Sequence, residues 1–319
     1  MPSVPSTPPH RIAGTLPVAA LVFNALVWGT SWWPFRRLES HGLHPLWATA
    51  MIFVLAAVVI SALRPRALGQ VLRTPALWVL VAASGTTNAA FNWAVVIGDV
   101  VRVVLLFYLM PLWTVLLARV LLGERFTTRA ALRVALGLAG AAIVLWPAGA
   151  VGVAALPLPR SLADGLGLLG GFTFALNNVM LRREAARPEE GRALAMFIGG
   201  AMVAGALASA LAAQGAVAWP PPAAAGWFGL ALALGVLFLF GNLALQYGAA
   251  RLPANRTAVV MLTEVLFAAA SAVAFGGEVL TWPIVIGGAL IACAAALSSP
   301  APAAALPSEP TSERARSGA

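Results

Sequence analysis

The sequence predicts an all-α integral membrane protein with ten transmembrane helices, built as two inverted five-helix repeats. Composition is the first reason: 61% of the residues are hydrophobic, 10% are charged, and the mean hydropathy is +0.89. Soluble domains carry about 25% charged residues, so this chain cannot cover a water-facing surface. Apolar runs of membrane length and an internal repeat are the second and third reasons.

The apolar runs divide the chain into ten expected helices. Crossing a hydrocarbon core of about 30 Å takes roughly 20 apolar residues in helical form. Helices are expected because they satisfy their own backbone hydrogen bonds in lipid, and the alternation of a barrel strand is absent. In chain order the spans are about 14–35, 44–63, 76–98, 101–121, 129–147, 162–181, 193–214, 225–249, 255–275 and 280–298.

The first span is expected to remain as a helix and not to be cleaved as a signal peptide. Only Arg11 precedes it, and its apolar run continues to Trp33 without a clear cleavage site. It also takes part in the repeat, because Arg36-Arg37 after the first span matches Arg182-Arg183 after the sixth.

The repeat itself keeps a constant offset of 154 residues, as from Asn88 to Asn242. Five helices per copy is an odd number, so the second copy must cross the membrane in the opposite sense. The expected domains are a first repeat over 14–147 and a second over 162–298, joined by a linker over 148–161 and flanked by disordered tails, 1–13 and 299–319. The matched pairs are Asn88/Asn242, Asn92/Gln246, Trp93/Tyr247, Arg102/Arg256, Gly123-Glu124/Gly277-Glu278 and Thr127/Thr281.

Arginine sets the expected orientation. All 20 basic residues are arginine; with a cytoplasmic N-terminus 16 of them lie inside and 4 outside. The positive-inside rule therefore predicts that both termini are cytoplasmic. The expected location is a prokaryotic plasma membrane, and the net charge of +9 is explained by topology without nucleic acid.

Several motifs resemble the EamA domain, the repeat unit of the drug/metabolite transporter superfamily. The first copy has Pro111-Leu-Trp-Thr followed by Gly123-Glu-Arg-Phe-Thr, and the second has Leu262-Thr-Glu-Val followed by Gly277-Glu-Val-Leu-Thr. The segment Trp28-Gly-Thr-Ser also resembles the first helix of that family. The resemblance implies a ten-helix carrier, often an exporter of amino acids, metabolites or toxic small molecules.

The ninth helix departs from the family pattern. The family often has Glu-Pro there, whereas Glu264 of this chain is followed by Val265. Proline appears only in the first copy, as Pro111, where it is expected to bend the fourth helix. The sequence therefore gives no proline to bend the ninth helix.

Amide and aromatic side chains within the spans are the candidate substrate ligands. Asn88 and Asn92 lie four residues apart on one helix face, and the second copy repeats this spacing. The alternative is a structural role, since amides between membrane helices contribute about 0.6–2 kcal/mol to association. The residues expected to line a central cavity are Asn24, Trp28, Asn88, Asn92, Trp93, Tyr108, Trp113, Asn242, Gln246, Tyr247 and Glu264. For each aromatic ring among them, core packing is the alternative.

Glu264 is the one acidic residue expected at the bilayer centre. A charge at that depth costs at least about 2.5–3.5 kcal/mol, so it needs a partner or a proton. Three roles are open: a proton-coupling site, an anchor for a substrate amine, or a neutral side chain hydrogen-bonded between helices.

Catalytic, metal-binding and cofactor-dependent classes find no support in the sequence. No P-loop, dinucleotide fingerprint, Gly-x-Ser-x-Gly or His-Glu-x-x-His occurs. His10, His41 and His44 fall in the tail or an outer loop, and the single Cys293 excludes an internal disulfide. The sequence predicts a secondary transporter, an exporter of small organic metabolites such as amino acids or amphipathic compounds. A scaffold or regulatory membrane subunit, or a membrane enzyme acting on a lipid-linked substrate, is the alternative.

Overall fold

The protein is helical throughout the part of the chain that the computed structural model describes, residues 15–98, 100–125, 127–144, 146, 159–222, 226–276 and 281–297. The first copy contains α1 (Leu16–Thr30), α2 (Trp32–Ser40), α3 (Pro45–Leu63), α4 (Arg66–Arg73), α5 (Pro75–Ile97), α6 (Val100–Phe107), α7 (Met110–Leu122) and α8 (Thr128–Val144). The second contains α9 (Leu162–Arg183), α10 (Glu189–Ala213), α11 (Phe228–Arg251), α12 (Ala254–Met261), α13 (Thr263–Gly276) and α14 (Trp282–Ala296).

Several sequence predictions concern residues outside this described part. They are the disordered tails 1–13 and 299–319, most of the linker 148–161, and the second Gly277-Glu278 pair.

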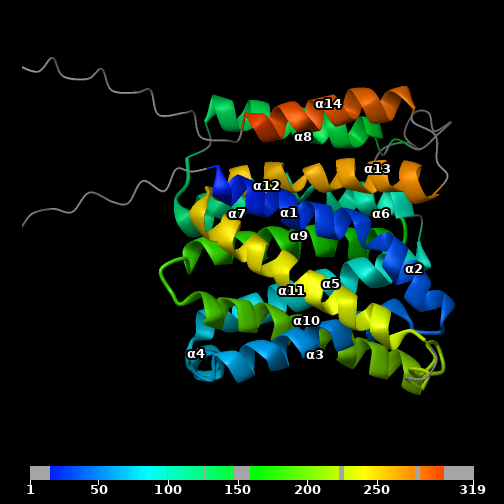
Figure 1. Ribbon diagram of the computed structural model, residues 1–319. Coiled ribbons are helices and arrows are strands. Elements are labelled where there is room, and N and C mark those ends of the chain that lie inside the picture. Colours follow the sequence, from blue (N-terminus) through cyan, green and yellow to red (C-terminus); the bar gives the residue numbers. More distant parts are fainter. Residues whose placement is uncertain are drawn as a thin grey trace, which may run out of the picture.

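The helices run roughly side by side and form layers (Figure 1). The pair α8 and α14 forms one outer layer, and α3 and α10 lie at the opposite side. Between them, α5 packs on both α9 and α10, while α1 packs on α11 and α13. The α8–α14 contact is backbone to backbone: a Cβ atom built on Gly140 would lie 2.5 Å from the carbonyl oxygen of Gly287. Glycine at this position therefore allows the two helices to approach closely.

Several helices are able to cross a membrane. Among the described residues, six are long and apolar enough, and a seventh is counted if α4 and α5, bent by 97°, form one span. Large apolar side chains on these helices face outward; Val120 is 79% exposed and Leu63 is 72% exposed. Such an exposed apolar surface suits lipid and not water. The chain is a multi-pass membrane protein.

Three of the expected spans are interrupted. The first span breaks at Ser31, between α1 and α2. The fourth breaks between Phe107 and Met110, and the ninth breaks at Leu262. The proline expected to bend the fourth span, Pro111, lies in the first turn of α7, where its missing N–H costs no hydrogen bond.

The breaks in the fourth and ninth spans occupy matched positions. Both ends of α6 lie 154 residues before the corresponding ends of α12, Val100 against Ala254 and Phe107 against Met261. In both breaks the backbone forms tighter i to i−3 hydrogen bonds, Leu109 N–H to Leu106 in one and Leu262 N–H to Val259 in the other. The ninth span therefore breaks without a proline, which the sequence did not indicate.

The expected turn at Gly123-Glu124 lies between α7 and α8. Gly123 has φ of +67°, the left-handed conformation that ends many helices and favours glycine. The Glu124 carboxylate accepts a hydrogen bond of 3.2 Å from the N–H of Ala254, the first residue of α12. This contact joins the two copies and places a negative charge at a helix N-terminus, where it is stabilising.

Candidate functional site

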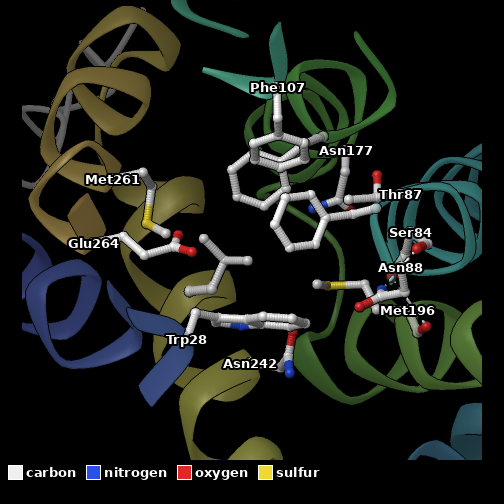
Figure 2. Close-up of a pocket in the computed structure, with 13 residues that line it drawn as sticks. Trp28, Ser84, Thr87, Asn88, Phe107, Asn177, Met196, Asn242, Met261 and Glu264 are labelled. Atoms are coloured by element: carbon white, nitrogen blue, oxygen red, sulfur yellow. Dashed lines mark hydrogen bonds between the residues drawn. The ribbon is translucent and has the colours of Figure 1, made fainter. Parts of the chain in front are cut away.

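A cavity lies between the two copies, near the middle of the helix layers. The empty space among its lining atoms, the part open to solvent included, amounts to about 530 Å³. Figure 2 shows side chains from both copies converging on it. Its lining residues are Trp28, Ser84, Thr87, Asn88, Phe91, Phe107, Phe174, Asn177, Met196, Asn242, Leu245, Met261 and Glu264.

Most of this lining consists of matched residues of the repeat. Three pairs keep the offset of 154 residues, and one keeps the offset of 146 residues that relates Arg36 to Arg182 in the first and sixth spans. The wall is therefore built largely by the same positions of each copy. The pairs are Asn88/Asn242, Phe91/Leu245, Phe107/Met261 and Trp28/Phe174.

Aromatic rings form the apolar part of the wall. Trp28 packs edge-on against Phe238, with 4.5 Å between ring centroids. Phe107 holds Phe91 at 4.8 Å and Phe174 at 5.6 Å. Because each ring contacts another ring, the aromatic surface is fixed in position before any ligand enters.

Hydroxyl and amide groups form a polar wall at one side of the cavity. The Ser84 hydroxyl donates to the Met196 carbonyl at 3.2 Å, and the Asn88 amide donates to the Ser84 carbonyl at 2.8 Å. The Thr87 hydroxyl lies 2.7 Å from the Ala83 carbonyl. The matched Asn242 repeats the bond of Asn88, donating to the Phe238 carbonyl four residues back at 2.9 Å.

Glu264 lies at the other side, facing this polar wall (Figure 2). It belongs to the first turn of α13, immediately after the break at Leu262. The Tyr108 hydroxyl, from the matched break of the first copy, donates a hydrogen bond to the Glu264 carboxyl. The N–H groups at the start of α13 add a favourable dipole for a carboxylate. Each copy thus supplies one member of this pair.

The structure brings together some of the residues that the sequence selected. Trp28, Asn88, Asn242 and Glu264 all line the cavity. Tyr108 lies behind Glu264, 4% exposed and in contact through its hydroxyl. A direct role of these residues in substrate binding stays a prediction.

The other selected amides do not line the cavity. The amide of Asn24 donates to the Gly241 carbonyl at 2.8 Å, which ties α1 to α11. The amide of Asn92 donates to the Thr49 hydroxyl at 2.6 Å, which ties α5 to α3. Gln246 is buried in α11, outside the lining. The bonds of Asn24 and Asn92 are those expected of amides that hold helices together.

Three of the selected aromatic residues also lie outside the lining. Trp113 packs edge-on against Phe172 of α9, at 5.7 Å. The guanidinium of Arg251 stacks over the Tyr247 ring at 3.7 Å, an arrangement that favours both groups. Trp93 is half-buried.

Sequence reasoning missed part of the lining. Ser84 lies one turn before Asn88 on the same face of α5, so the i, i+4 pattern that selected Asn88 extends back to it. Phe107 and Met261 carry the 154-residue offset, and the repeat pairs them although neither is polar. Asn177 stands next to Asn178, and the sequence does not tell which of the two amides lines the cavity; both are buried in the structure.

No metal-binding group is evident where the chain is described, since three His, Cys, Asp or Glu side chains nowhere gather there. His44 caps α3 instead, its Nδ1 accepting the Leu46 N–H at 3.3 Å. Burial lowers the pKa of His44, and the nearby Glu39 opposes this effect.

Comparisons with known proteins agree with this architecture. The model of the EamA-like transporter family matches residues 15–146 and again residues 161–299. A solved structure described only as the crystal structure of a protein is 18% identical, with a TM-score of 0.70 over 89% of this chain and 95% of that one. At this identity the likeness shows the fold alone. No curated protein matches the chain.

Proposed function

Because the chain belongs to the EamA-like transporter family, within the drug/metabolite transporter superfamily, we propose that it carries small organic molecules across the membrane by alternating access. Members of this family are transporters and not enzymes. The observation that carries the proposal is the cavity lined by matched residues of the two copies. Secondary transporters place their substrate site at such an interface between repeats.

The proposal includes ten spans in two inverted repeats, 14–147 and 162–298. Helix packing supports this arrangement, because contacts recur when the copies are exchanged. The contact of α1 with α11 corresponds to that of α9 with α5. The contacts of α9 with α6 and α7 correspond to those of α1 with α12 and α13. In the pairs α3–α10 and α8–α14 the two helices are matched members of the two copies, so exchanging the copies leaves each pair unchanged.

We place both termini in the cytoplasm of a prokaryotic plasma membrane. The arginine count supports this. At the ends of α9 and α11 that face the cytoplasm in this topology, the Arg182 guanidinium donates to the Ala250 carbonyl at 2.8 Å, and Arg251 pairs with Glu189 at 2.7 Å. The proposed direction is outward, driven by a proton gradient through Glu264 or by the gradient of the substrate itself.

The cavity counts against the two alternatives. A scaffold or regulatory subunit has no need of a cavity lined by polar groups of both copies. A membrane enzyme on a lipid-linked substrate needs an acid/base pair at a membrane surface, whereas Glu264 with Tyr108 lies between the helix breaks in the interior.

Cysteine labelling tests alternating access without a known substrate. Replacing Cys293 with serine removes the single cysteine, and Met196→Cys then places a thiol in the cavity wall. Ser40→Cys, at an exposed position, and Gly69→Cys, where an added side chain meets open space, are matched controls on opposite sides of the proposed membrane. A membrane-impermeant maleimide is added to right-side-out and to inside-out vesicles.

We expect the cavity thiol to react from both sides and each control thiol from one side only. Reaction of Met196→Cys in only one of the two vesicle preparations would reject alternating access. Reaction of both controls from the same side would reject the ten-span topology.

A further inference from the structure

We propose that the cavity selects organic cations with hydrogen-bond donors at both ends, an ammonium at one and a hydroxyl or N–H at the other, joined by an apolar or aromatic body. Zwitterions that end in a carboxylate are disfavoured. This inference rests on the proposed carrier function and names the substrate class of the same site. It follows from which hydrogen-bonding atoms of the wall are already occupied.

The donors of the polar wall are bonded to backbone carbonyls. Ser84 Oγ donates to the Met196 carbonyl, and the amide nitrogens of Asn88 and Asn242 each donate to a carbonyl four residues back. A backbone carbonyl can only accept. It therefore fixes which end of each amide is nitrogen and leaves the amide oxygen free to accept.

Two amide oxygens of the lining lack a partner: the Asn88 oxygen, whose orientation is fixed in this way, and the Asn177 oxygen. Asn88 Oδ1 and Asn177 Oδ1 are buried without a hydrogen bond in the described structure, and the two residues are 6% and 1% exposed while lining the cavity. A buried acceptor left unpaired costs free energy that an N–H or O–H of a ligand would recover. A ligand carboxylate offers only further acceptors, so it would add repulsion to the unpaired oxygens.

The opposite side of the cavity suits an ammonium. Among the lining residues that the structure describes, Glu264 is the one charged side chain, and neither arginine nor histidine belongs to that set to pair with a ligand carboxylate. The Tyr108 hydroxyl occupies part of the carboxyl's accepting capacity; a carboxylate has about four lone-pair positions in all, so the rest can accept an ammonium.

Aromatic faces lie between the two polar ends. In Figure 2 the rings of Trp28 and Phe107 stand between Glu264 on one side and Ser84, Asn88 and Asn177 on the other. Such faces attract cations and pack against apolar bodies. The cavity therefore has a distinct place for each part of a two-ended cation.

Isothermal titration calorimetry on the full chain in detergent tests the proposal with three probes that share a phenyl ring. Tyramine carries an ammonium at one end and a phenol hydroxyl at the other, phenethylamine carries only the ammonium, and para-(aminoethyl)benzoate carries the ammonium and, at the far end of the ring, a carboxylate. We expect tyramine to bind most tightly, phenethylamine second and para-(aminoethyl)benzoate weakest. The Kd of tyramine is expected to be at least about tenfold below that of para-(aminoethyl)benzoate, because the carboxylate loses one hydrogen bond and adds repulsion.

Two variants assign the ends of the ligand. Glu264→Gln is expected to weaken the binding of tyramine and phenethylamine alike, by about 10- to 100-fold, because a hydrogen bond to a charged group is lost. Asn88→Leu is expected to weaken the binding of tyramine alone by about 2- to 10-fold. Asn92→Leu is the matched control: Asn92 lies one turn on, bonded to Thr49 outside the lining, and its loss should leave the order of the probes unchanged.

Three results would overturn the inference: para-(aminoethyl)benzoate binding as tightly as tyramine, equal binding of tyramine and phenethylamine, or binding of none of the probes. If Asn88→Leu does not fold, Asn88→Ala replaces it. The two-sided labelling of Met196→Cys is independent of these probes. The substrate class can therefore fail while the carrier function stands, and the reverse outcome is equally visible.

Discussion

The break between α6 and α7 and the break between α12 and α13 have the same shape and different chemistry. The short helix before each break starts and ends at positions 154 residues apart. Tyr108 of the first break corresponds to Leu262 of the second, and Met110 corresponds to Glu264. The first break is followed by Pro111, whereas the second has Val265 at that position.

This difference shows that the two copies share the backbone geometry of the break, whereas the polar side chains at the breaks differ between the copies. The acceptor, Glu264, is in one copy and its hydroxyl donor, Tyr108, is in the other. Each break alone has half of the pair. Moving or removing one member of the pair therefore tests whether the two breaks are equivalent in structure only.

Placing a second carboxylate at the matched position should have the largest effect. Met110 is 0% exposed. The residue that matches Tyr108 in the second copy is Leu262, so a carboxylate at position 110 would find no hydroxyl donor there. Met110→Glu is therefore expected to lower the free energy of unfolding by about 2.5–3.5 kcal/mol, the cost of an unpaired charge in a membrane helix. Thermal unfolding in detergent measures it, with Met110→Gln as the uncharged control. A Met110→Glu protein as stable as its control would mean that the two breaks accept a carboxylate equally.

Removing the donor should have an intermediate effect. Tyr108→Phe keeps the ring and deletes the hydroxyl that Glu264 accepts from, at an expected cost of about 1.5–3 kcal/mol of unfolding free energy. A double-mutant cycle with Glu264→Gln separates the pair from its surroundings. If the two substitutions add without coupling, the bond between the copies does not contribute to stability.

Replacing the proline should have the smallest effect. Pro111→Ala is expected to change the unfolding free energy by less than about 1 kcal/mol, since α13 begins at the matched place without a proline. Val265→Pro is the reciprocal change, and it should cost more, because the Val265 N–H donates to the Leu262 carbonyl at 3.1 Å. Unfolding temperatures of the two variants decide the order. A larger loss for Pro111→Ala would make the proline the cause of the first break.

The sequence predicted the helical class and the membrane location because both depend on composition and on the length of apolar runs. The constant offset also paired Asn88 with Asn242 across a cavity that both of them line. Helical periodicity, however, identifies a face and not a depth along the helix. Asn92 lies one turn beyond Asn88, and at that depth it meets Thr49 of α3 and not the cavity.

The break at Leu262 could not be predicted for a related reason. No proline marks it, and the side-chain bond at the site, from the Thr263 hydroxyl to the Val260 carbonyl at 2.7 Å, is one that threonine also makes in unbroken helices. The conformation there depends on packing between helices, which the neighbouring residues in the sequence do not predict.

The single carboxylate has a consequence for how such a protein can have arisen. Two identical subunits related by a two-fold axis would carry either two copies of Glu264 or none, and a ligand between them could bind in two equivalent orientations. Joining two copies of a gene in one reading frame removes that constraint, because each position is then inherited separately. With Glu264 on one side of the cavity and amide oxygens on the other, a cargo has one preferred orientation, and the same end of it leads on every passage.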